Sequence, residues 1–143
     1  SFLIVLGTFI TMEFVSWATH KYIMHGFLWN LHQDHHVVDK NKIFQKNDYF
    51  FLIFAIPSIV LMYYGFSNMS VEFFIGLGIL FYGIAYFLVH EVIIHRRLPP
   101  PSKTKSKYIK AIRKAHKIHH KNLGKKNGVN FGMLIVPKKY FKS

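Results

Sequence analysis

The chain has 143 residues, of which 51% are hydrophobic, yet its formal net charge is +13. This length suits one domain, and we treat residues 1–143 as a single unit. The chain contains no cysteine, which excludes thiolate metal ligands and iron–sulfur clusters.

Three apolar blocks, at residues 2–18, 50–66 and 71–89, each contain at most one acidic or basic residue. Helices of these lengths reach roughly 25–29 Å, close to the ~30 Å hydrocarbon core of a bilayer. We therefore predict an all-α integral membrane protein with about three transmembrane helices. The other interpretation, buried helices of a large soluble protein, is disfavoured because no amphipathic helices remain to cover the blocks.

Basic residues lie on one side of the predicted spans. Four of the nineteen Lys and Arg residues lie between the first and second blocks, and the other fifteen lie beyond His95. Because Lys and Arg mark the cytoplasmic side, we predict that the spans carry a cytoplasmic helical cap. The basic residues flank spans and form no nucleic-acid motif, so we expect the lipid bilayer as a partner and no nucleic acid.

Beyond the third block, residues 98–102 (LPPPS) cannot continue a helix. Residues 108–121 have the apolar periodicity of a helix. Residues 129–136 are apolar but too short to span, so they form either a buried return or an interfacial segment.

All ten histidines fall into four short motifs, which run HX4H, HX2HH, HX4H, HX2HH along the chain. The motifs are His20 and His25; His32, His35 and His36; His90 and His95; His116, His119 and His120. So many imidazoles suit iron, zinc or copper, and ten ligands suit two octahedral ions with about two positions left for water or oxygen. A structural zinc needs only four ligands. We predict a di-metal site in the cap, with all ten histidines as ligands.

The two spacings place their rings differently. On a helix, HX2HH puts three rings on one face, so we expect each such motif to aim them together. The two histidines of an HX4H motif are separated on a helix by one full turn plus about 140°. Both rings reach one site only if the helix ends or carries a π-bulge, or else they bind two metals from different sides. His90-Glu91 is not the zinc-protease motif HExxH, because its second histidine is at 95.

Four acidic residues are candidates for outer contacts to ligand histidines. Glu13 lies inside a span, where a functional or paired role is expected, including a bond to a histidine. Asp34 and Glu91 either orient imidazoles through their outer ring nitrogen or are solvated. Asp48 either caps the second span or bonds a histidine.

The four motifs on membrane spans resemble those of the fatty acid hydroxylase/sterol desaturase superfamily. More narrowly, residues 18–26 (ATHKYIMHG), Trp29 and the first HX2HH motif are similar to the bacterial β-carotene hydroxylases. Further matches are residues 47–49 (NDY), 90–96, 115–120 (AHKIHH) and 131–132 (FG), so the resemblance covers nearly the whole chain. The proline-rich loop at 99–101 and the lysine-rich stretch after it differ from the linker expected of the family.

The resemblance implies a carotenoid β-ring 3-hydroxylase, a di-iron monooxygenase of the bacterial cytoplasmic membrane. Such an enzyme uses two Fe ions, for which Zn can substitute in purified protein, and O2 as co-substrate. It takes electrons from a ferredoxin-type donor and converts a lipophilic carotenoid, β-carotene, through β-cryptoxanthin to zeaxanthin. We expect the substrate to enter from the bilayer along a channel whose candidate walls are Trp17, Tyr82, Gly83 and Tyr86.

Two alternatives remain. A fatty-acid or sterol hydroxylase or desaturase of the same superfamily shares this chemistry. A membrane metal-binding or transport protein belongs to another class, but transport sites usually lie near the bilayer midplane in broken helices. Here the motifs lie at or beyond the ends of the predicted spans.

Overall fold

The computed structural model describes residues 1–37, 44–97 and 104–141, and within these ranges every regular element is a helix. The elements are α1 (Phe2–Ala18), the π-helix η1 (Thr19–Phe27), α2 (Trp29–His36), the 3-10 helix η2 (Lys46–Asp48), α3 (Tyr49–Gly65), α4 (Val71–Phe87), the π-helix η3 (Leu88–Ile94), α5 (Lys107–His120) and the 3-10 helix η4 (Lys138–Tyr140). The predicted all-α class is confirmed. The helix break predicted at 98–102 lies outside the described residues.

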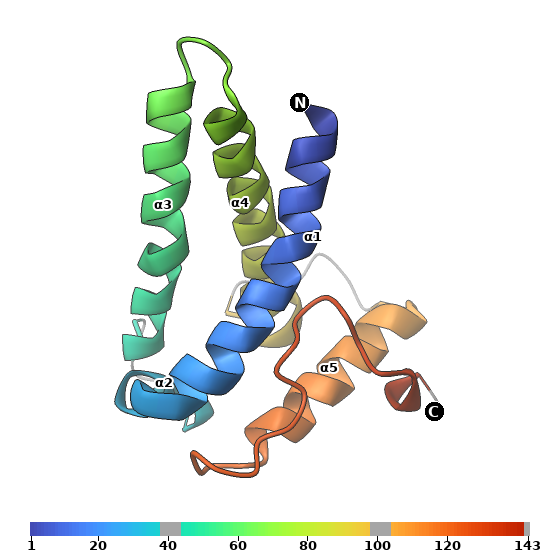
Figure 1. Cartoon of the computed structure of the whole chain (residues 1–143). Coiled ribbons are helices and arrows are strands. Elements are labelled where there is room, and N and C mark those ends of the chain that lie inside the picture. The colour runs from blue at the N-terminus through green and yellow to red at the C-terminus, as the bar shows by residue number, and fades with distance from the viewer. Residues whose placement is uncertain (38–43, 98–103, 142–143) are drawn as a thin grey trace.

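The helices form a bundle and a cap (Figure 1). Helices α1, α3 and α4 stand side by side, with the N-terminus and the α3–α4 turn at one end and α2 and α5 at the other. Within the described ranges, three helical stretches are long and apolar enough to cross a bilayer, Phe2–Phe27, Lys46–Gly65 and Val71–Ile94. The chain therefore has the helical architecture of an integral membrane protein, as the apolar blocks predict.

Close helix packing in the bundle depends on small residues of α4. A Cβ atom added at Gly76 would lie 2.7 Å from the carbonyl oxygen of Ser58 on α3, and one at Gly78 would lie 2.6 Å from Cβ of Thr8 on α1. The hydroxyl of Ser58 also donates to the carbonyl of Gly76, at 2.7 Å. Small residues let membrane helices approach closely, because apolar side chains gain little by leaving lipid. Helix α4 is thus the central helix of the bundle.

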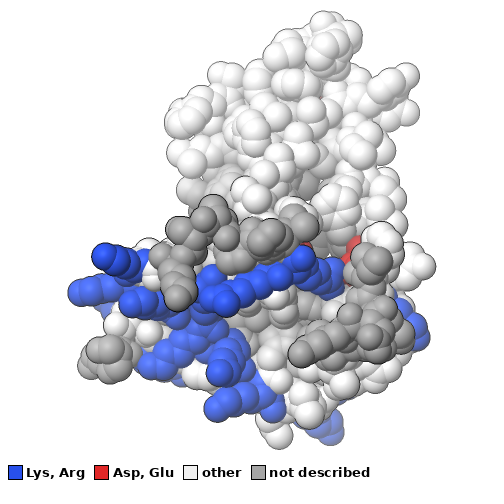
Figure 2. All heavy atoms as spheres, turned by 180° about the vertical axis from the view of Figure 1, so that it is seen from behind, with Lys and Arg blue, Asp and Glu red and all other residues white. Residues whose placement is uncertain are grey.

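The cap is basic outside and histidine-lined inside. Helix α5 buries Ala111, Ile112 and Ala115 on the same side as two of its histidines, as its predicted periodicity requires. On the face seen in Figure 2, Lys and Arg side chains gather on the cap, and none is seen on the bundle above it. The segment after α5 rises beside α1 and turns back down to η4 (Figure 1), so residues 129–136 form a return against the bundle.

Candidate metal centre

Each HX4H motif lies in or directly at the end of a π-helix. His20 and His25 are both in η1, while His90 is in η3 and His95 follows it. The wider helix is closed by i→i+5 bonds, from the N–H of His95 to the carbonyl of His90 (2.9 Å), for example. The ring centroids of His20 and His25 are 5.3 Å apart, and those of His90 and His95 are 4.5 Å apart. Of the alternatives left open by the spacing, the π-helix is the one that forms, and each pair faces one site.

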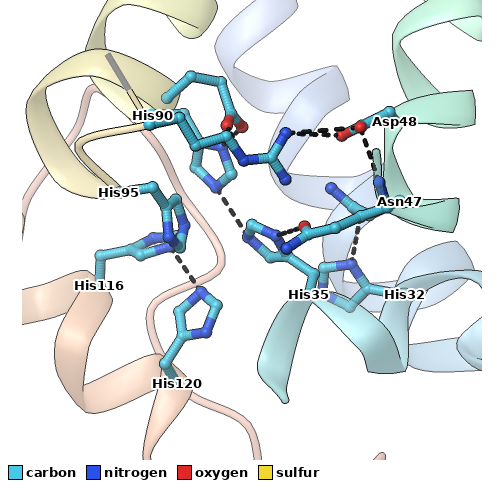
Figure 3. Close-up of polar contacts among 11 residues, drawn as sticks. His32, His35, Asn47, Asp48, His90, His95, His116 and His120 are labelled. Atoms are coloured by element: carbon cyan, nitrogen blue, oxygen red, sulfur yellow. Dashed lines mark hydrogen bonds and ion pairs between the residues drawn. The ribbon is translucent and has the colours of Figure 1, made fainter. Parts of the chain in front are cut away.

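The ten histidines converge in two groups. Group A contains five buried histidines whose ligand atoms lie within 4.8 Å of one another: His20, His25, His32, His36 and His119. Group B contains four histidines that meet the same limit: His35, His90, His95 and His116. The Nε2 atom of His120 lies 2.8 Å from that of His116, so we assign His120 to group B. Figure 3 shows His35, His90, His95, His116 and His120 approaching from α2, η3 and α5.

Each HX2HH motif divides its rings between the two groups, so the expectation that all three face one site is wrong. In the first motif, His32 and His36 belong to group A but His35 belongs to group B. In the second motif, His116 and His120 belong to group B but His119 belongs to group A. On an α-helix, residues i and i+4 lie about 40° apart, whereas residue i+3 lies about 60° to the other side. Each group thus takes four histidines from one half of the chain and one from the other half.

The spacing of the inner nitrogens fits metal coordination. In six pairs within the groups, the Nε2 atoms are 2.8–3.2 Å apart. Two nitrogens each ~2.1 Å from one ion lie about 3.0 Å apart at a 90° angle and about 3.4 Å apart at a tetrahedral angle. The donor set and its spacing therefore fit ions with more than four ligands.

The outer ring nitrogens determine which tautomer faces inward. His25 and His119 donate from Nδ1 to the carbonyls of Lys125 (3.2 Å) and Val129 (2.7 Å). Each Nε2 is then an unprotonated acceptor, yet these two atoms lie 3.2 Å apart. Facing lone pairs at this distance repel unless a cation lies between them. The pair therefore suits metal ligands better than hydrogen-bonded core histidines.

Five further outer contacts follow the same pattern. The Nδ1 atoms concerned and their oxygen partners are His20 with Phe131 O (3.0 Å), His32 with Asn47 Oδ1 (2.6 Å), His35 with Gln45 Oε1 (2.9 Å), His36 with Asn122 O (2.9 Å) and His90 with Glu91 Oε1 (2.5 Å). Figure 3 shows the contacts of His32 and His35 with the η2 region. Sequence reasoning assigned no role to Asn47 or Gln45. The only signal was that Asn47 belongs to the NDY stretch matched to the family, and nothing marked Gln45.

The four acidic candidates differ in what they contact. Glu91 bonds His90 and pairs with Nε of Arg97 at 2.8 Å, which agrees with the orienting role. Asp34 accepts the N–H of Lys46 at 2.6 Å. Asp48 accepts the N–H of Gln45 at 2.9 Å and pairs with Arg97, so it caps η2 at the entrance to the second span. Among the described residues, neither Asp34 nor Asp48 bonds a histidine.

Glu13 also contacts no histidine among the described residues. Its carboxylate accepts hydrogen bonds from Tyr82 and from three consecutive backbone amides of the segment after α5. It is paired, as expected of an acidic residue in a span, but with a backbone segment.

Burial keeps the histidines outside the spans neutral. Desolvation lowers the pKa of His32 and of His119 to about 3, and that of His36 and of His95 to about 4. It also lowers the pKa of His120, to about 2. Neutral imidazole is the form that binds a metal, so at neutral pH these rings are ready to coordinate.

An apolar cavity of about 570 Å³ lies between α1, the end of η3, α5 and the segment after α5. His116 of group B lines it, together with apolar residues that include Ile10, Phe14 and Ile135. These three side chains are 62%, 66% and 74% exposed, so the cavity lies open toward the surroundings of the first span.

Of the four predicted channel residues, only Trp17 lines this cavity. Tyr82 is buried against Glu13, and the ring of Tyr86 lies 5.1 Å from that of His90. A Cβ atom added at Gly83 would meet nothing within 4 Å. The cavity is lined by α1, the end of η3, α5 and the segment after α5, and no residue of α4 (Val71–Phe87) is part of its lining.

Comparisons with known proteins agree with this architecture. The sequence model of the fatty acid hydroxylase family matches residues 5–141. The β-carotene hydroxylase of Pantoea ananas is 41% identical over 135 residues, which are 94% of this chain and 77% of that protein. The β-carotene hydroxylase of Paracoccus sp. (strain N81106 / MBIC 01143) is 35% identical over 138 residues, covering 96% of this chain and 85% of that protein. The chloroplastic β-carotene 3-hydroxylase 2 of Arabidopsis thaliana is 35% identical over 142 residues, covering 96% of this chain and 46% of that longer protein. No solved structure is a significant match.

Proposed function

The chain belongs to the fatty acid hydroxylase family, and from this premise we propose that it is a carotenoid β-ring 3-hydroxylase. The reaction converts β-carotene through β-cryptoxanthin to zeaxanthin. The observation that carries the proposal is the apolar cavity lined by His116, which joins a surface beside the spans to a metal-ligand group. The names of the bacterial and plant relatives supply the substrate class.

Two iron ions are the proposed cofactor, one held by group A and one by group B. Bound iron would supply the oxidising power to break an unactivated ring C–H bond with O2, which no side chain supplies. In the balanced reaction one oxygen atom enters the C–H bond at C3. The other leaves as water after taking up two electrons and two protons.

The residues of the chain bind and shield the reacting ring. Apolar walls at Ile10, Phe14 and Ile135 would hold the ring while the polyene remains in lipid, which avoids exposing a long apolar chain to water. Exclusion of water at the metal-facing end also protects reactive species from side reactions. Residues 1–143 act as one domain in this proposal, because each group takes one histidine from the other half.

A ferredoxin-type electron donor is the proposed protein partner. Ferredoxins are acidic, and the Lys and Arg side chains gathered on the cap (Figure 2) complement such a partner. The same basic surface supports placing the cap on the cytoplasmic side of the bacterial cytoplasmic membrane. Because the chain has no cysteine, Ser67→Cys and Lys125→Cys would report topology cleanly. A membrane-impermeant label added outside should reach only the cysteine at position 67.

Expression in a bacterium that accumulates β-carotene tests the proposed reaction. Chromatography should show β-cryptoxanthin and zeaxanthin with the natural chain, and unchanged β-carotene with His116→Ala. Ile59→Ala, on the exposed face of α3, is the matched control and should retain product formation. Unchanged β-carotene with a natural chain that is inserted and iron-loaded would refute the proposal.

Fatty-acid or sterol hydroxylation or desaturation is the second candidate, because the matching family is described by fatty acid hydroxylation. Lipid analysis of the same cells separates the two. New hydroxylated or desaturated lipids with unchanged β-carotene would favour this candidate.

A further inference from the structure

Glu13 is an acidic residue buried near the middle of the first span. Its Oε1 atom accepts the backbone N–H groups of Met133 (2.9 Å), Leu134 (2.8 Å) and Ile135 (2.9 Å). Its Oε2 atom accepts the hydroxyl of Tyr82, at 2.7 Å. The hydroxyl and the three backbone N–H groups all donate to Glu13, so its carboxylate acts only as an acceptor in these four hydrogen bonds.

The bound segment needs such an acceptor. Residues 129–137 are not helical, and they rise beside α1 (Figure 1) to the level of Glu13. Non-helical backbone at membrane depth is tolerated only where its N–H groups find partners within the protein. One carboxylate oxygen supplies a partner to three of them. A Cβ atom added at Gly132 would lie 3.4 Å from the same oxygen, so the segment approaches the carboxylate closely.

The same segment reaches both the metal centre and the cavity. The carbonyls of Val129 and Phe131 accept from Nδ1 of His119 and His20, two members of group A. The ring of Phe131 packs edge-on against three group A rings, with centroids 5.1–5.4 Å away. Residues 130–133 and 135–137 of the segment line the cavity.

We propose that Glu13 is a positioning residue, which holds segment 129–137 against the first span and thereby orients His20 and His119 and closes the cavity wall. Glu13 also lines the cavity, but the role proposed here is exerted through the segment, and Glu13 belongs to neither histidine group. The inference rests on the metal-binding part of the proposed function and is independent of which substrate is hydroxylated.

The test replaces Glu13 by Leu and by Gln. Leu removes the acceptor and makes the span more apolar, so membrane insertion is retained. Gln keeps one acceptor oxygen and can donate to the hydroxyl of Tyr82, so it serves as the conservative rescue. Glu72→Gln, at the exposed start of α4, is the matched control.

Hydrogen exchange followed by mass spectrometry, and iron release to a chelator, are the two readouts on the iron-loaded protein in lipid nanodiscs. In Glu13→Leu the amides of residues 133–135 should exchange at least about tenfold faster, while the α3–α4 amides keep their protection. Iron should leave roughly 10- to 100-fold faster, as when outer partners of ligand histidines are lost. Glu13→Gln should lie between Leu and the natural chain, and Glu72→Gln should match the natural chain.

Natural exchange at 133–135 and natural iron retention in Glu13→Leu would overturn the proposal. If Glu13→Leu also loses α3–α4 protection, Gly132→Val decides, because its side chain would crowd Ile135 O and Glu13 Oε1, which lie 3.3 and 3.4 Å from the added Cβ atom, while the carboxylate stays. Selective loosening of 133–135 with faster iron release in Gly132→Val supports the proposal, and natural behaviour in both readouts overturns it. Absence of carotenoid hydroxylation in the natural chain would refute the proposed reaction but leave both readouts intact.

Discussion

Groups A and B have five histidines each but differ in how those histidines are supported. All five outer nitrogens of group A bond an oxygen, four of them a backbone carbonyl and one Asn47. In group B, within the part of the chain that the structure describes, only His35 and His90 have an oxygen partner on Nδ1. Group B also lines the cavity through His116. The more firmly oriented group contributes no histidine to the lining of the cavity proposed for the substrate, whereas the less constrained group lines it through His116.

Loss of a ligand should have the largest effect, and the same effect in both groups. We expect His32→Ala in group A and His116→Ala in group B each to reduce hydroxylation by more than the roughly 10- to 100-fold typical of outer partners. Both variants should still insert, because the spans pair their own backbone. Product analysis on membrane fractions with matched protein levels measures this. Near-normal turnover in several of the ten histidine variants would show that fewer than ten rings bind metal.

Loss of an oxygen partner of a histidine Nδ1 should affect the two groups differently. Chelation of the natural protein should release iron in two phases, the faster from group B. We expect Asn47→Ala to accelerate the slow phase by roughly 10- to 100-fold, because His32 loses the oxygen that orients it. Asn68→Ala, in the exposed α3–α4 turn, is the control for the loss of an asparagine. A slow phase that Asn47→Ala leaves unchanged would contradict the difference between the groups.

Acid should destabilise the metal-free protein. Burial lowers the pKa of His32 and His119 to about 3 and that of His36 and His95 to about 4, whereas the unfolded chain binds protons near 6.5. The unfolded state then holds more protons below pH 6.5, so stability falls as the pH falls from about 6.5 toward about 4. Thermal unfolding in detergent at pH 7.5 and pH 5 measures this effect. An unchanged midpoint would show that the rings are solvated in the metal-free protein.

The smallest expected effect concerns the cavity beside group B. We expect Ile135→Trp to narrow its opening and to raise KM several-fold with little change in iron content, because Ile135 binds no histidine. Ile56→Trp, on the exposed face of α3, is the matched control. Gly83→Phe should act like this control, since the position opens into free space. If Gly83→Phe raises KM more than Ile135→Trp, the ring enters along α4 instead.

The sequence predicts the spans, the helical cap and the ten-histidine set, because composition and spacing are local properties. It also reduces the HX4H geometry to a few alternatives that include the π-helix. The sharing of His35 and His119 could not be predicted, because it depends on how α2 and α5 meet. The partner of Glu13 was equally hidden, since backbone amides leave no residue-type signal. Asn47 and Gln45 act through a turn whose position relative to α2 is set by tertiary packing.

Each half of the chain supplies one histidine, His35 or His119, to the group formed mainly by the other half, and this has a consequence for biosynthesis. Before α5 has been made, group A lacks His119, and group B has only His35, His90 and His95. Neither site is complete until the last quarter of the chain has emerged and docked beneath the bundle. The spans can therefore insert before metal is bound, and metal binding at either proposed site would have to wait for α5.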